Sequence, residues 1–134
     1  MTTWHSTELC EAVSGLLYTS EGDEPFQEVF VALGAATWPL RADQIMQIVG
    51  YAPEVKVEER TLDEFLARHI ERADPLDEKM QVMRPRFESL RATLRAMLRD
   101  LRVFRVGAVE VRCYVVGADS VGNLAGLVTT AFES

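Results

Sequence analysis

Three carboxylates within four residues form a dense group of side chains that could bind a cation or a basic partner. Glu21, Asp23 and Glu24 are followed by Pro25, and a proline disfavours the helical conformation in the residue before it. We therefore predict an exposed polar loop over residues 18–25. Such a loop is commonly a solvated turn, but concentrated negative charge also attracts the basic cleft of a partner protein and raises the association rate.

The two histidines give little indication of a metal centre. His5 lies near the N-terminus and His69 follows Leu62 by seven residues in a helical pattern, with no second histidine or cysteine at metal-ligand spacing. We predict that His69 is a packed, hydrogen-bonded side chain. A small metal-dependent enzyme built on Glu21, Asp23 and His69 is the weakest hypothesis for this chain, and it requires these side chains to lie close together.

The sequence lacks the short motifs of common catalytic sites. It contains no Gly-x-Ser-x-Gly turn, no phosphate-binding Walker loop, no dinucleotide fingerprint and no Cys-x-x-Cys pair. We therefore expect a protein that is not an enzyme and that carries no cofactor. Cys10 and Cys113 occur in unrelated segments and are expected to be buried, reduced thiols.

Charge is unevenly distributed along the chain. The net charge is −7, and residues 1–83 hold sixteen acids and six bases, whereas residues 84–105 hold seven arginines and two acids. Arg91, Arg95 and Arg99 recur every four residues, which predicts one arginine-lined helix face. Without interleaved aromatic side chains, this pattern favours a solvated face paired with acidic segments over a nucleic-acid site. A nucleic-acid site at residues 84–105 remains a hypothesis that salt-dependent binding would test.

Hydrophobic spacing predicts the helices that position these residues. Short helices are expected at residues 7–17, 43–49 and 61–73. The last of them should open with a capping box formed by Thr61 and Glu64. Asp74-Pro75 should cap a long helix that extends to Leu101. A kink or a restart is expected at Pro85, because proline removes a backbone donor.

The strands are expected at residues 26–33 and 55–58, and in a C-terminal β-meander at 103–106, 109–116 and 123–132. Gly107-Ala108 suits the first turn of the meander as a two-residue loop. In the middle strand, apolar residues alternate with their neighbours and predict one buried face, namely Val109, Val111, Cys113 and Val115.

The elements together predict a single domain over residues 1–134, an α+β or α/β sandwich with a mixed sheet. The absence of a long apolar run or a signal peptide predicts a cytoplasmic protein without membrane contact.

Two long segments resemble the nuclease A inhibitor family. They are Gly15–Phe26 and the C-terminal stretch from Val103–Gly107 through Gly122–Gly126 to Glu133-Ser134, and in spacing the match spans nearly the whole chain. The resemblance implies an α+β fold, an α-β-α sandwich with a mainly antiparallel sheet. It also implies tight inhibition of a sugar-non-specific, Mg²⁺-dependent nuclease of the ββα-metal type, through occupation of its active-site cleft.

The resemblance also assigns roles to individual residues. In the family, the C-terminal hydroxyl-bearing residue reaches the catalytic metal ion of the nuclease and a glutamate after the first helix supports it, and these positions are Ser134 and Glu21 here. Asp23, Glu24 and Glu133 would imitate substrate phosphates. Mg²⁺ prefers hard oxygen ligands, and Ser134 offers a carboxylate and a hydroxyl. The only metal expected is therefore that of the bound nuclease, and we expect a monomer that binds its nuclease one to one, with no direct nucleic-acid contact.

One departure from the family concerns the loop before the long helix. An aromatic contact of the family falls here at Asp74-Pro75-Leu76, which contains no tryptophan. Aromatic side chains are common anchors of interface energy. The sequence therefore keeps open an alternative, in which the same scaffold is a non-inhibitory acidic protein-binding module.

Overall fold

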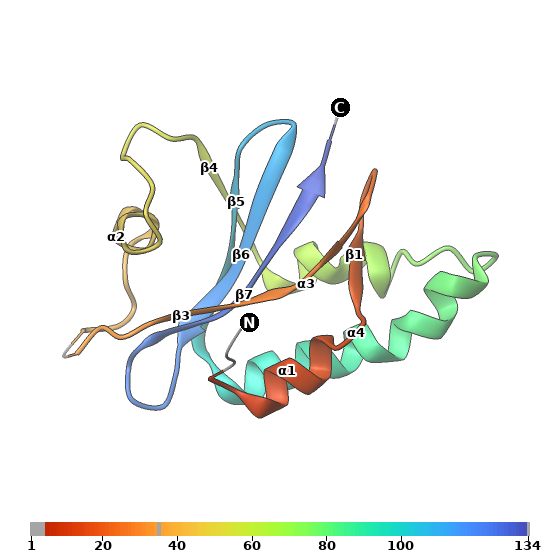
Figure 1. Ribbon diagram of the computed structural model, residues 1–134, viewed down its shortest axis with the longest axis horizontal. Coiled ribbons are helices and arrows are strands. Elements are labelled where there is room, and N and C mark those ends of the chain that lie inside the picture. Colours follow the sequence, from red (N-terminus) through yellow and green to blue (C-terminus); the bar gives the residue numbers. More distant parts are fainter. Residues whose placement is uncertain (1–4, 35, 134) are drawn as a thin grey trace.

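The main element of the molecule is a five-stranded sheet with helices on both faces (Figure 1). The computed structural model describes residues 5–34 and 36–133. The strand order is β3-β7-β6-β5-β4, with β3 at Gln27–Val31, β4 at Val57–Arg60, β5 at Arg99–Val106, β6 at Glu110–Ala118 and β7 at Leu124–Phe132. The α+β class and the C-terminal meander are confirmed. All pairings among the described residues are antiparallel, so the sheet is not mixed.

One face of the sheet is covered by α1 (Thr7–Val13), α3 (Leu62–Leu66), the 3₁₀ turn η1 (Ala67–His69) and α4 (Glu78–Met97). The helices bury their apolar stripe against alternate residues of the central strands. The largest buried side chains of this core include Leu9, Leu16, Leu66, Phe87, Leu90, Leu94, Val103, Val111 and Leu127. Cys113 is buried there and Cys10 is half-buried, both as free thiols.

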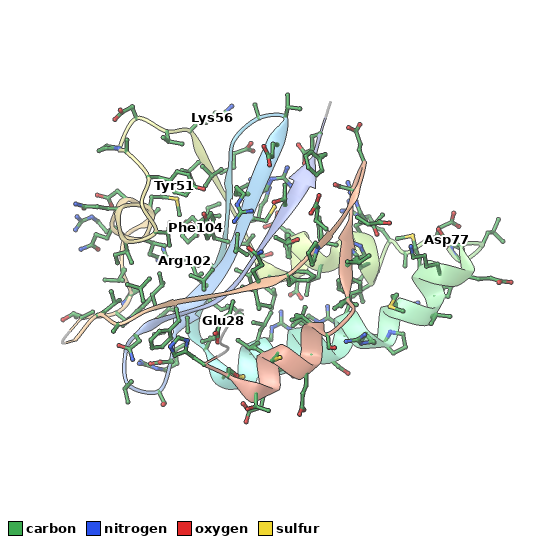
Figure 2. The ribbon with its side chains drawn as sticks, viewed as in Figure 1. Glu28, Tyr51, Lys56, Asp77, Arg102 and Phe104 are labelled. Carbon is green, nitrogen blue, oxygen red and sulfur yellow. The ribbon has the colours of Figure 1, made fainter. Side chains whose placement is uncertain are left out.

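The opposite face of the sheet packs against α2 (Ala42–Ile48) and the segments around it. Figure 2 shows Tyr51 and Phe104 on this side. Tyr114 and Val116 of β6 are buried here, while Val111 and Cys113 point to the first core. The alternation predicted for β6 therefore separates two cores, because helices cover both faces. Val109, which was predicted to be buried, precedes the strand and is 66% exposed. None of the helices in the described ranges is both long and apolar enough to cross a membrane.

The first helix is shorter than predicted. It ends at Val13, and Gly15 then adopts a positive φ of 69°, a conformation that glycine reaches without a steric penalty. The chain turns there, and Leu17–Thr19 forms β1, which pairs with β2 at Asp23–Pro25. The acidic segment is therefore a small hairpin and not an irregular loop.

The long helix begins and ends within the predicted range. The Asp77 carboxylate accepts a hydrogen bond from Met80 N–H at 3.1 Å, so Asp77, not Asp74, is the N-cap (Figure 2). The helix continues through Pro85 without a restart and ends at Met97. Leu98 is extended, with φ −122° and ψ 138°, and the chain continues as strand β5. Leu98 and Leu101 pack on the same core as the helix, so their spacing resembled a continuation of the helix.

The other predicted elements lie close to their expected positions. The Thr61 capping box is present with Glu64, but the regular helix ends at Leu66 and continues as η1. The turn between β5 and β6 spans residues 107–109, one residue longer than the predicted loop.

Candidate partner-binding site

The tip of the acidic hairpin lies against the C-terminal end of β7 (Figure 1). Phe132 N–H donates to Ser20 Oγ at 2.9 Å, and Glu21 N–H donates to the Phe132 carbonyl at 3.4 Å. A Cβ atom at Gly22 would lie 3.4 Å from the Phe132 ring, an ordinary van der Waals contact, so the hairpin tip packs beside this ring. These contacts join the hairpin tip and the end of β7 into one unit.

The hairpin is also fixed from its other side by η1. Thr19 N–H donates to His69 Nε2 at 3.0 Å, and the Thr19 carbonyl accepts a hydrogen bond from Arg68 Nη1 at 3.0 Å. Inside the hairpin, Ser20 N–H donates to the Gly22 carbonyl at 2.9 Å. Two adjacent side chains thus satisfy both backbone groups of Thr19, and a three-residue strand is held in place by tertiary contacts.

His69 is the packed, hydrogen-bonded residue that the sequence predicted. It is 4% exposed, and its ring centroid lies 4.8 Å from that of Tyr18 and 4.2 Å from that of Phe87. Burial lowers the pKa of His69 to about 4, because desolvation disfavours the charged form. Since Nε2 accepts the bond from Thr19, the neutral ring carries its proton on Nδ1, which has no hydrogen-bond partner among the described residues.

The three residues of the enzyme hypothesis do not assemble a metal site. Within residues 5–34 and 36–133, no group of three or more histidines, cysteines or carboxylates is arranged to hold a metal ion. His69 interacts electrostatically with Asp23, but its nearer neighbours are aromatic rings and the Thr19 backbone. The described residues therefore do not form the three-residue metal site that the metal-dependent enzyme hypothesis requires.

The predicted carboxylates differ in their surroundings. Asp23 is exposed and accepts a hydrogen bond from Thr19 Oγ1 at 2.7 Å, and Lys79 Nζ lies 3.6 Å from it. The Thr19 hydroxyl, and secondarily Lys79, hold the pKa of Asp23 below its usual range. Glu21 is exposed at the hairpin tip and Glu24 is half-buried in β2.

The final residues continue the edge of β7. Glu133 N–H donates to the Val109 carbonyl at 2.8 Å, and the Glu133 carboxylate forms an ion pair with Arg105. Ser134 lies outside the described residues. Glu21 and Glu133 line one surface cavity of about 410 Å³, together with Thr19, Ser20, Arg68, Met80 and Phe132. The structure therefore brings two of the predicted carboxylates, from opposite ends of the sequence, to one concave surface.

Sequence reasoning missed the residues that hold this surface together. Ser20, Arg68 and Arg105 were not singled out, although each binds a predicted segment. The position of Arg105 in its strand could have indicated that it has a partner. It stands two residues after Val103 in a strand and therefore shares the face that buries Val103, and a charge on an inward face calls for a partner.

The arginines of the long helix pair with acidic segments, as predicted. Arg91 Nη1 lies 2.8 Å from Glu71 and 3.2 Å from Asp63, and Arg95 Nη2 lies 2.7 Å from Asp63. Arg99 belongs to β5, so the expectation that it extends the helix face is wrong. These pairs support the solvated-face interpretation over the nucleic-acid hypothesis.

The loop before α4 presents an apolar side chain where the sequence lacks an aromatic one. Leu76 is 90% exposed. Its N–H donates to Asp74 Oδ1 at 2.9 Å, and Gln81 Nε2 donates to the Asp74 carbonyl at 2.9 Å. The loop is thus an ordered turn that holds Leu76 outward.

The chain matches a known protein family. A family model described as "Nuclease A inhibitor-like protein" matches residues 5–134, which include both the hairpin and the C-terminal strands. No curated protein matches the chain.

Proposed function

Because the chain belongs to the nuclease A inhibitor-like family, we propose that residues 1–134 act as one domain that inhibits a nuclease protein. Family membership supports a nuclease inhibitor in general. The specific proposal is that the target is a sugar-non-specific, Mg²⁺-dependent nuclease of the ββα-metal type, bound one to one at its active-site cleft. The observation that carries this proposal is the hydrogen-bonded union of the hairpin tip with the end of β7.

In this proposal, Ser134 is the residue that enters the active site. It follows Glu133, whose backbone is bonded to Val109, and Phe132, whose backbone is bonded in both directions to the hairpin. A terminal residue that leaves a fixed strand loses less conformational freedom on binding than one on a free tail. Its carboxylate and hydroxyl are hard oxygen donors suited to the Mg²⁺ ion of the nuclease. That ion belongs to the partner, so the inhibitor carries no cofactor and no catalytic residue of its own.

We propose that the four carboxylates contribute unequally to binding of the nuclease. We assign the leading electrostatic role to Glu21, because its backbone is bonded to the end of β7 and its side chain is exposed beside the tail. Asp23, Glu24 and Glu133 then add to a field that steers the inhibitor toward a basic cleft.

A titration tests this function. Purified full-length chain is added to a ββα-metal nuclease at a concentration well above the expected dissociation constant, in Mg²⁺, and residual DNA cleavage is measured. We expect a linear loss of activity that ends at one inhibitor per nuclease. Undiminished cleavage at a large excess of inhibitor would contradict the proposal.

The loop at Leu76 favours one alternative. The family makes an aromatic contact from this position, and the chain presents an exposed aliphatic side chain there. A non-inhibitory protein-binding module would keep the acidic hairpin and bind a different basic partner through it. Affinity capture from the source cell decides between the two, since recovery of one consistent protein that lacks nuclease activity favours the module.

A further inference from the structure

A second surface cavity, of about 510 Å³, is lined by four arginines in a chain whose net charge is −7. The arginines are Arg60, Arg68, Arg72 and Arg105. Arg68 also lines the cavity beside the C-terminal tail, so the two hollows are neighbours. The remaining lining residues are Tyr18, Glu64, Phe65, Ala67 and Glu71.

The arginines reach the cavity from two sides. In the β4–β5 pairing, Arg60 lies opposite Val103 and Glu58 opposite Arg105. Paired residues share a face, as do residues two apart in a strand, and Val103 is buried in the core beneath α3 and α4. Arg60 and Arg105 therefore project from the helix-covered face of the sheet. Arg68 in η1 and Arg72 shortly after it supply the other side.

The two acids of the cavity are engaged elsewhere. Glu64 Oε1 accepts a hydrogen bond from Thr61 N–H at 2.8 Å, as part of the helix cap. Glu71 Oε1 accepts one from Arg91 Nη1 at 2.8 Å, and Arg91 does not line the cavity. Neither carboxylate forms an ion pair with the four arginines within the described residues, although Glu64 interacts electrostatically with Arg60. The lining therefore holds four arginines against two carboxylates.

Two of the arginines have no carboxylate partner in the part of the chain that the structure describes. Arg68 donates to the neutral carbonyl of Thr19, which occupies one of its five N–H donors. The backbone N–H of Arg72 donates to the Ala67 carbonyl at 2.7 Å, whereas its guanidinium forms no ion pair or side-chain hydrogen bond with a described residue. Arg60 is paired with Glu58 at 2.7 Å, and Arg105 with Glu133.

We propose that this arginine cavity binds a phosphate group, either as free phosphate or as the terminal phosphate of a nucleotide. A phosphomonoester carries about −1.5 to −2 charges near pH 7 and three acceptor oxygens, and the planar guanidinium fork matches these oxygens in pairs. The Arg105 side chain is only 20% exposed, so its field is less screened by water. The acidic remainder of the protein opposes binding weakly, because salt screens charges beyond about 8 Å.

Arg105 links this site to the C-terminal tail. A phosphate that takes up Arg105 competes with the carboxylate of Glu133 for the same guanidinium. Phosphate binding and the anchoring of the Glu133 side chain therefore oppose each other, and by reciprocity the removal of one strengthens the other. The site itself consists of residues of this chain alone and does not depend on nuclease inhibition.

Amide NMR titrations of the full chain test the site without any nuclease. One arm uses inorganic phosphate and the other a nucleoside 5′-monophosphate, both at constant ionic strength with chloride as the balancing anion. We expect saturable shifts confined to residues around 60, 67–72 and 105. Tighter binding of the nucleotide would identify a nucleotide phosphate as the ligand, and equal binding would identify phosphate alone.

Three variants, of which one is a control, extend the test. Arg72→Gln should weaken phosphate binding about tenfold, the effect of one charge-assisted hydrogen bond, and Glu133→Gln should strengthen it. Arg84→Gln removes a positive charge from the exposed face of α4 and should leave binding unchanged. The proposal is overturned if neither ligand gives saturable shifts, or if Arg72→Gln and Arg84→Gln have equal effects.

Discussion

Phe132 N–H donates a hydrogen bond to the hydroxyl of Ser20 at 2.9 Å, across a sequence separation of 112 residues. Together with the bond from Glu21 N–H to the Phe132 carbonyl, it sets the position of the chain end relative to the acidic hairpin. The two elements that the proposed function needs are therefore placed by the fold before any partner binds.

Replacing Ser20 with alanine tests this union. Ser20→Ala leaves Phe132 N–H without its acceptor, and a lost hydrogen bond of this kind costs about 1 kcal/mol in the free energy of unfolding. We expect that loss in urea unfolding, accompanied by weaker nuclease inhibition because the tail is less well fixed. Ser89→Ala, at an exposed position of α4, is the matched control. Equal stability and inhibition in the two variants would show that the bond does not position the tail.

The buried histidine predicts a pH dependence of stability. The pKa of His69 is about 4 in the folded protein and about 6.5 when unfolded, so the unfolded state binds the proton more tightly. The stabilisation is complete above about pH 6.5 and is lost as the pH falls toward 4, by on the order of 3 kcal/mol. Protonation also ends the acceptance of the Thr19 N–H bond by Nε2.

Urea unfolding at several pH values between about 4 and 7 measures this slope. His69→Gln should flatten it, because glutamine can accept the Thr19 bond but does not titrate in that range. An unchanged slope in His69→Gln would assign the pH dependence to other groups.

The hairpin carboxylate predicts an effect on inhibition and not on folding. Glu21→Gln removes the charge nearest the backbone bond to Phe132, and we expect inhibition to weaken about tenfold or more, with a slower association rate at low salt. Glu11→Gln, an exposed acid of α1, changes the net charge equally. If both variants lose affinity to the same extent, the overall charge and not the hairpin attracts the nuclease.

The exposed leucine before α4 predicts a contact with the partner. Leu76 is 90% exposed, so Leu76→Ser should leave the free energy of unfolding within about 0.5 kcal/mol of the original value. If this loop touches the nuclease, the same change should weaken inhibition severalfold. Val121→Ser, at a 72% exposed position in the turn between β6 and β7, is the control. Equal inhibition by the two variants would place Leu76 outside the interface.

The sequence predicted the parts of the fold that have a regular hydrophobic period. The meander follows from the alternation in β6, the α3 start from the capping box at Thr61, and the packed state of His69 from its position in a helical pattern. The hairpin escaped prediction because β1 and β2 have three residues each, too few for a period to emerge. Its stability comes from Arg68 and His69, which are distant in sequence.

Only some of the residues at the candidate site could be singled out from the sequence. Glu21 and Glu133 were singled out by the family resemblance, and the structure brings them to one cavity. The pairing of Glu133 with Arg105 spans 28 residues and depends on strand register, which residue types alone do not reveal. The arginine cavity likewise combines four residues that occupy separate segments of the sequence.

Removal of Ser134 is the most direct test of the central claim, that the end of the chain is the inhibitory element. The chain that ends at Glu133 keeps the bonds of Phe132 and Glu133 to the rest of the fold, so its thermal unfolding should match that of the full chain. We predict inhibition at least about thirtyfold weaker, as expected for an interface residue worth about 2 kcal/mol. A folded, truncated chain that titrates the nuclease as well as the full one would contradict the account.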